Sequence, residues 1–62
     1  MILVKDLINK MDGFTYWRVY NDITLEPIGD YSLANNDYEV ISIMGDKNGV
    51  IHIFVKEVKN NG

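Results

Sequence analysis

Apolar positions along this chain of 62 residues follow two spacings, and each spacing predicts a kind of element. Helical spacing comes first, because four apolar residues recur every three or four positions near the start and predict a helix over residues 3–11. These four residues are Val4, Leu7, Ile8 and Met11. Gly13, two residues beyond the last of them, is expected to end the helix in a left-handed conformation.

Strand-forming segments follow the helix. Residues 15–21 are aromatic and β-branched, which predicts a first strand. Residues 23–25 resume the alternation, and they predict a second strand that is short or at an edge because Pro27 has no amide donor. Residues 30–37 are rich in turn formers, with one helical turn expected around residues 31–34.

The strongest local signal is a β-hairpin. Residues 38–44 and 50–58 are β-rich, and the segment between them ends in Asn48-Gly49, a pair that supports positive φ angles. A single helix followed by a run of strands is the α+β pattern. The sequence therefore predicts one α+β domain over residues 1–62, with one N-terminal helix packed on a three- to four-stranded antiparallel sheet.

Period-two alternation assigns the strand residues to two faces. The face expected beneath the helix carries Trp17, Val19, Ile41, Ile43, Ile51, Ile53 and Val55. The opposite face carries Tyr16, Arg18, Tyr20, Val40, Ser42, Met44, Val50, His52 and Phe54. One helix cannot cover both faces, and a second apolar face on a small domain usually marks an interface.

We expect this interface to use Tyr16, Arg18, Tyr20, Met44, His52 and Phe54. A symmetric homodimer is the first candidate, since most soluble oligomers are closed and symmetric. The alternative is that amphipathic tyrosines and scattered valines are simply tolerated on an exposed sheet. His52, the only histidine, is either a structural or solvated side chain or part of the interface.

Residue types limit the chemistry that this chain can perform. The chain has no cysteine and one histidine, so disulfides are excluded and a structural zinc site nearly so. Neither a catalytic triad nor a glycine-rich phosphate loop occurs, and a domain of this size leaves little room for a cleft between paired carboxylates. We expect a protein without enzyme activity, cofactor or metal.

Negative charge is concentrated in the middle of the chain. The net charge is -3, and residues 22–46 hold six of the nine acids and no base. The candidate binding residues of this acidic segment are Asp22, Glu26, Asp30, Asp37 and Glu39. The segment disfavours nucleic-acid binding and suits either a basic protein surface or a solvated loop region. No stretch resembles a signal peptide or a membrane span, so we expect a cytoplasmic protein.

The opening run Val4-Lys5-Asp6-Leu7-Ile8-Asn9-Lys10-Met11 resembles the start of small phage and prophage accessory proteins of Gram-positive bacteria. In those proteins a similar helix leads into a strand like residues 17–20, and the chain closes with an acidic strand like residues 37–43 and an apolar one. Leu3 stands where such proteins often have a threonine or another helix-capping residue. The resemblance implies an accessory gene product that acts by binding, a group that includes inhibitors of bacterial immunity.

Three functions remain open at this level. The first is a stoichiometric inhibitor of a host defence protein, which would use the aromatic sheet face, the acidic segment or both. The second is a binder of a signalling nucleotide, in which Arg18 and His52 would contact phosphate while Tyr16 or Tyr20 stacks on the base. The third is a structural or oligomeric accessory protein.

Overall fold

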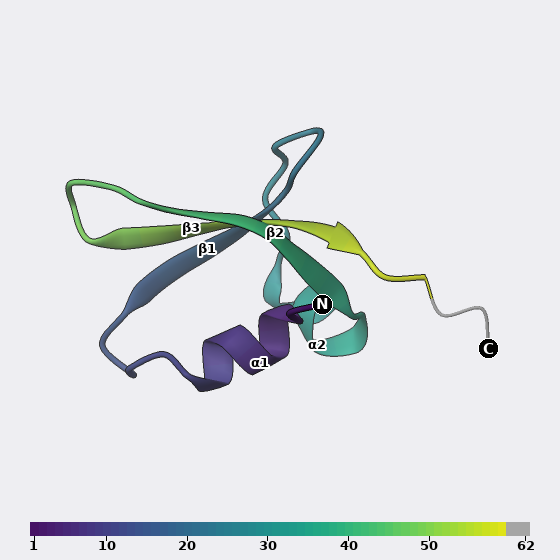
Figure 1. The fold of residues 1–62 in the computed structure, drawn as a ribbon, viewed down its shortest axis with the longest axis horizontal. Coiled ribbons are helices and arrows are strands. Elements are labelled where there is room, and N and C mark those ends of the chain that lie inside the picture. Colours follow the sequence, from purple (N-terminus) through teal and green to yellow (C-terminus); the bar gives the residue numbers. More distant parts are fainter. Residues whose placement is uncertain (60–62) are drawn as a thin grey trace.

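A three-stranded mixed sheet and two short helices make up the computed structural model, which describes residues 1–59 (Figure 1). The elements, in chain order, are α1 (Val4–Asn9), β1 (Tyr16–Asn21), α2 (Asp30–Asn35), β2 (Tyr38–Gly45) and β3 (Val50–Glu57). The sheet order is β1-β3-β2. The predicted α+β class is therefore confirmed, whereas two details of the sheet are wrong: it has a parallel pair, and residues 23–25 do not form a strand.

The path of the chain after β1 explains both differences. Oδ1 of Asn21 accepts hydrogen bonds from the N–H groups of Ile23 (2.9 Å) and Thr24 (3.0 Å), which bends the chain where a second strand was expected. Residues 26–28 then run back beside β1 and form only an isolated bridge, Tyr20 with Pro27. The chain crosses beneath the sheet through α2 before β2, so β1 pairs with β3 in parallel.

The hairpin of β2 and β3 is confirmed as antiparallel. The N–H of Gly49 donates to the carbonyl of Asp46 (3.2 Å), and Gly49 has the positive φ of 83° that the turn requires. Oδ1 of Asp46 also accepts hydrogen bonds from the N–H groups of Asn48 (2.8 Å) and Val50 (3.1 Å). The turn is thus fixed by both backbone and side-chain bonds.

The N-terminal helix is shorter than residues 3–11. Leu3 precedes α1 in an extended conformation without a side-chain cap, and its backbone forms a bridge with Glu39 of β2. The helix ends at Asn9, and Gly13 lies in a later turn without a positive φ, so the predicted left-handed stop is wrong. The pairing of Leu3 with the sheet, rather than a capping side chain, fixes where α1 begins.

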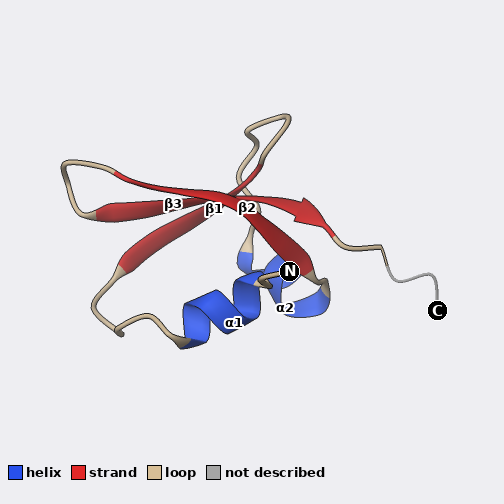
Figure 2. Cartoon of the chain, viewed as in Figure 1, coloured by secondary structure: helices blue, strands red, loops and turns tan. Residues whose placement is uncertain are grey.

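Both helices lie on the same side of the sheet (Figures 1 and 2). The buried residues of the described chain are Val4, Val19, Ile53 and Val55, of which Ile53 and Val55 have no exposed surface. Partly buried residues of both helices and all three strands pack around this core, among them Leu7, Ile8, Trp17, Leu33 and Val40. This small core lies between the helices and one face of the sheet, and the other face has no helix over it.

Val40 is on the helix-covered side, not on the opposite face where alternation placed it. A register shift between Val40 and Ser42 inserts Ile41 as an extra residue, so Val40 is opposite Val55 while Ser42 is opposite Phe54. Ile41 is 46% exposed and does not join the buried core. The remaining residues of β2 keep the faces that the sequence predicted.

Leu25 has a φ of 63°, which is strained for a residue with a Cβ. Its side chain is 60% exposed, so its replacement loses little packing. We expect Leu25→Gly to raise the free energy of unfolding by about 0.5–1 kcal/mol, because relief of the strain exceeds the added entropy of the unfolded chain. Urea denaturation measures the change. Ile23→Gly is the matched control, since Ile23 has no positive φ and its replacement by glycine should destabilise the domain; equal effects of the two substitutions would contradict the prediction.

Candidate functional site

The uncovered face of the sheet brings together the six residues predicted as an interface. Strand pairing places Arg18 and Met44 on either side of His52 in one row. In the next row Tyr20 is beside Phe54, and Tyr16 lies beside Val50 nearer the start of β3. Because residues paired in register share a face, all six lie opposite the helices. We call this set the outer face: Tyr16, Arg18, Tyr20, Met44, His52 and Phe54.

Tyr20 is the centre of an aromatic group on the outer face. Its ring stacks on Phe54 with centroids 5.4 Å apart and an interplanar angle of 25°, and it lies 5.6 Å from the ring of His52. Side chains that already contact one another lose less conformational freedom when a partner binds. Tyr16 and Met44 flank this group with 75% and 55% of their surface exposed. The outer face therefore has a fixed aromatic centre and accessible apolar neighbours.

A hydrogen-bonded chain links β1, β3 and the hairpin turn. The hydroxyl of Tyr20 donates to Nδ1 of His52 at 2.9 Å, and Nε2 of His52 donates to Oδ2 of Asp46 at 2.8 Å. A neutral imidazole with its proton on Nε2 satisfies both contacts. The participation of Asp46 was not predicted, because the distance from the turn to His52 depends on the hairpin register. These two hydrogen bonds hold the outer-face side chains of Tyr20 and His52 in place.

The hydrogen bond from His52, followed by that from the Val50 N–H, lowers the pKa of Asp46 below its ordinary value, and the loss of water around the carboxyl group opposes this shift. A carboxyl group with a lowered folded-state pKa stabilises the fold above its unfolded pKa of about 4, and this contribution is lost as the pH falls through the folded-state pKa. We therefore expect wild type to exceed Asp46→Asn in stability at pH 7, with a difference that shrinks as the pH falls below about 4. Urea denaturation of both proteins at pH 7 and at lower pH tests this expectation. A stability difference that does not change with pH would contradict it.

The acidic segment does not form a single surface. Lys5 pairs with Asp37, and this contact raises the pKa of the lysine; Lys56 pairs with Glu39 at 3.4 Å across the hairpin. Asp22 is half-buried at the end of β1, where its N–H donates to the carbonyl of Val55, and its Oδ1 has no hydrogen-bond partner among residues 1–59. Glu26 and Asp30 are exposed in the loop after β1 and at the first turn of α2. The five acids thus lie apart, and two of them are already paired.

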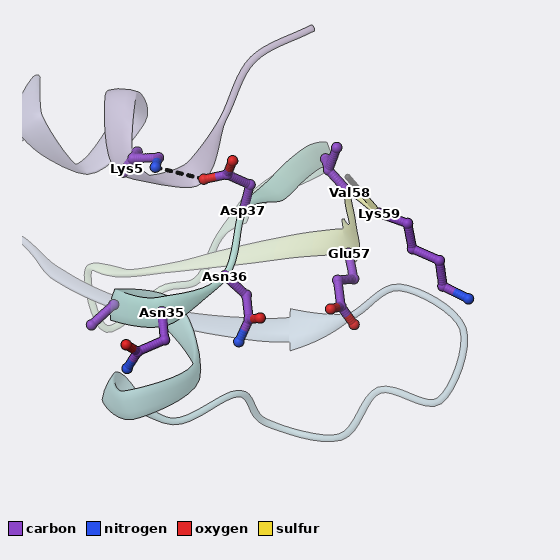
Figure 3. Close-up of a pocket in the computed structure, with 8 residues that line it drawn as sticks. Lys5, Asn35, Asn36, Asp37, Glu57, Val58 and Lys59 are labelled. Carbon is purple, nitrogen blue, oxygen red and sulfur yellow. Dashed lines mark ion pairs between the residues drawn. The ribbon is translucent and has the colours of Figure 1, made fainter. Parts of the chain in front are cut away.

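A polar hollow of about 500 Å³ lies beside the paired Asp37, between the end of α2 and the end of β3 (Figure 3). The residues lining it are Lys5, Ala34, Asn35, Asn36, Asp37, Glu57, Val58 and Lys59. Two bases and two acids line this hollow, and no aromatic side chain does. The hollow therefore has no surface on which a ring could stack, and its charges are not of a single sign. No sequence motif marks this hollow, and its chemistry favours no class of ligand.

Within residues 1–59 no three carboxylate or imidazole groups gather as the ligands of a metal ion. None of the helices described there has the length and apolar character to cross a membrane.

Comparisons with protein-family models, with curated proteins and with solved structures find no match to this chain. The resemblance of its opening helix to phage accessory proteins stays a prediction.

Proposed function

We propose that this chain is a non-catalytic protein-binding domain whose outer face binds a partner protein in a stoichiometric complex. The observation that carries the proposal is the gathering of aromatic and apolar side chains on the one sheet face that neither helix covers. Tyrosine and arginine are common anchors of protein interfaces, and this face presents Tyr16, Tyr20 and Arg18.

The loop after β1 extends the proposed surface. It projects to the side of the sheet away from the helices, and it carries Ile23 and Leu25 with 85% and 60% of their surface exposed (Figure 1). A protein partner that covers both the face and the loop would bury apolar area at two places. The strained backbone at Leu25 supports this, since strain is often retained at binding loops.

The partner that we propose is a bacterial host protein, inhibited when its surface is covered. This step follows from the resemblance of residues 4–11 to phage accessory proteins, a group that includes inhibitors of bacterial immunity.

The nucleotide-binding alternative is less well supported by the geometry. Both ring nitrogens of His52 are occupied by Tyr20 and Asp46, so the imidazole is not free to donate to a phosphate. Arg18 is exposed and has no ion-pair partner within residues 1–59, which leaves a single cation for that role. A phosphate group usually requires several charged or backbone donors.

Affinity purification from an extract of a Gram-positive bacterium tests the proposal with three forms of the tagged chain: wild type, Tyr16→Asp and Tyr31→Asp. Tyr31 is a matched control because it is 82% exposed, against 75% for Tyr16, and lies on α2. We expect one host protein at near-equal stoichiometry with wild type and Tyr31→Asp, and at least about tenfold less with Tyr16→Asp. Equal retention by all three forms, or none by wild type, would refute the proposal.

A further inference from the structure

The open edge of β2 is a second exposed apolar feature, separate from the centre of the outer face. Of the ten large hydrophobic residues exposed in residues 1–59, three lie on this part of β2. They are Ile41, Ile43 and Met44. An apolar edge strand with free backbone groups is a template for pairing with another strand.

Only the beginning of this edge is occupied. The N–H of Val40 points out of the sheet and donates to the carbonyl of Ile2 at 2.8 Å, and Leu3 forms a bridge with Glu39. Beyond Val40, residues 41–45 have no strand on their outer side within residues 1–59, because β2 is the last strand in the order β1-β3-β2. We call residues 41–45 the open edge.

Strand alternation shows which backbone groups of the open edge point outward. The N–H of Asp46 points inward, to the carbonyl of Val50 in β3. Alternation then directs the backbone N–H and carbonyl of Met44 inward, toward β3, and those of Ile43 outward. The same direction follows from the other end, since Ile43 shares the helix-covered face with Val40, whose N–H points outward. Ile43 therefore presents both an N–H and a carbonyl to a neighbouring strand.

We propose that a second copy of this chain pairs antiparallel with the open edge, with the two-fold axis at Ile43. In this register each Ile43 N–H donates to the Ile43 carbonyl of the other copy, and residue 42 lies opposite residue 44. The two sheets become one six-stranded sheet. Pairing ends at Val40, because its outward N–H already donates to the carbonyl of Ile2. The new ladder is therefore limited to the open edge.

Two observations favour a second copy over a strand from another protein. The open edge carries no charged residue, so two copies meet without like-charge repulsion although the chain has a net charge of -3. The buried hydrophobic residues of the described chain are only Val4, Val19, Ile53 and Val55, and a domain with so small a core commonly gains stability from oligomerisation. A copy of the same chain is present wherever the domain folds.

This dimer differs from the one first expected from sequence, which used the outer face. Here the two outer faces lie side by side in one sheet and stay uncovered, so each can bind a partner. The proposed dimer does not rest on the proposed function. The Tyr16→Asp substitution separates the dimer from partner binding, since this substitution should weaken partner binding and leave the dimer intact.

Amide hydrogen exchange and sedimentation on the full chain test the dimer. We expect twice the chain mass at about 1 mM, with Ile43 amide exchange at least about tenfold slower than at about 10 µM, where dissociation frees the edge. Ile43→Lys should give a folded monomer, because it places like charges opposite each other. Ile43→Pro should do the same by removing the outward N–H. Ile23→Lys, in the exposed loop, is the control.

Several results would overturn the proposal. A wild-type monomer at about 1 mM would show that the edge is free or serves another protein. Equal Ile43 exchange at both concentrations would exclude pairing at this position, and this measurement decides even if the Ile43 variants fail to fold. A dimer lost in Tyr16→Asp and kept in both Ile43 variants would place the contact on the outer face.

Discussion

Ile53→Ala is expected to leave most of the chain unfolded at 25 °C. Ile53 has no exposed surface, lies on the central strand β3, and is flanked by Val19 on β1 and Ile43 on β2. Truncation of a buried isoleucine costs about 2–5 kcal/mol, and a domain of this size rarely has more than about 3–5 kcal/mol in total. Circular dichroism and urea denaturation measure the loss.

The matched control for that experiment is Ile23→Ala. Ile23 is 85% exposed in the loop after β1, so removal of the same atoms should change the free energy of unfolding by less than about 0.5 kcal/mol. A cost below about 1 kcal/mol for Ile53→Ala would show that the domain does not depend on a core centred on β3.

Tyr20→Ala is expected to reduce affinity for the proposed partner by at least about 30-fold, which corresponds to about 2 kcal/mol. Tyr20 stacks on Phe54 and donates to His52, so its ring is held in place before a partner arrives. Its removal takes away a contact surface and also frees the His52 imidazole, which loses its partner at Nδ1. Titration calorimetry with the purified partner measures the change.

Two further variants separate the ring from the hydroxyl. Tyr20→Phe keeps the stacking on Phe54 and loses only the hydrogen bond to His52, so its affinity should lie between those of wild type and Tyr20→Ala. Tyr31→Ala, on α2, should bind as wild type does. Unchanged affinity of a folded Tyr20→Ala variant would remove the aromatic centre of the outer face from the binding surface.

Local sequence signals predicted the elements that depend on neighbouring residues. The turn from Asp46 to Gly49 is set by bonds within five residues, and the hairpin that it closes was predicted correctly. The stripe of Val4, Leu7 and Ile8 likewise predicted α1, although the helix ends earlier than expected. Alternation also placed all six outer-face residues together, because each faces the same way whichever strand it pairs with.

Features set by distant contacts were not predictable in the same way. The parallel pairing of β1 with β3 depends on the path of the whole chain between them, and the extra residue at Ile41 depends on how β2 fits β3. One signal was available, since Asn21 directly before Asp22 is a typical turn pair, and Asn21 does bend the chain away from a second strand. The contact of Asp46 with His52 required the hairpin register.

Side-chain footprinting with hydroxyl radicals tests most directly whether the outer face binds a protein. Tyr16 and Tyr31 form an internal pair, with the same chemistry, 75% and 82% exposure, and positions on β1 and α2. We expect labelling of Tyr16 to fall sharply in the complex with the proposed partner protein relative to the isolated chain, while labelling of Tyr31 stays the same. Protection of Tyr31 with Tyr16 still labelled, or no change at either tyrosine, would contradict the account.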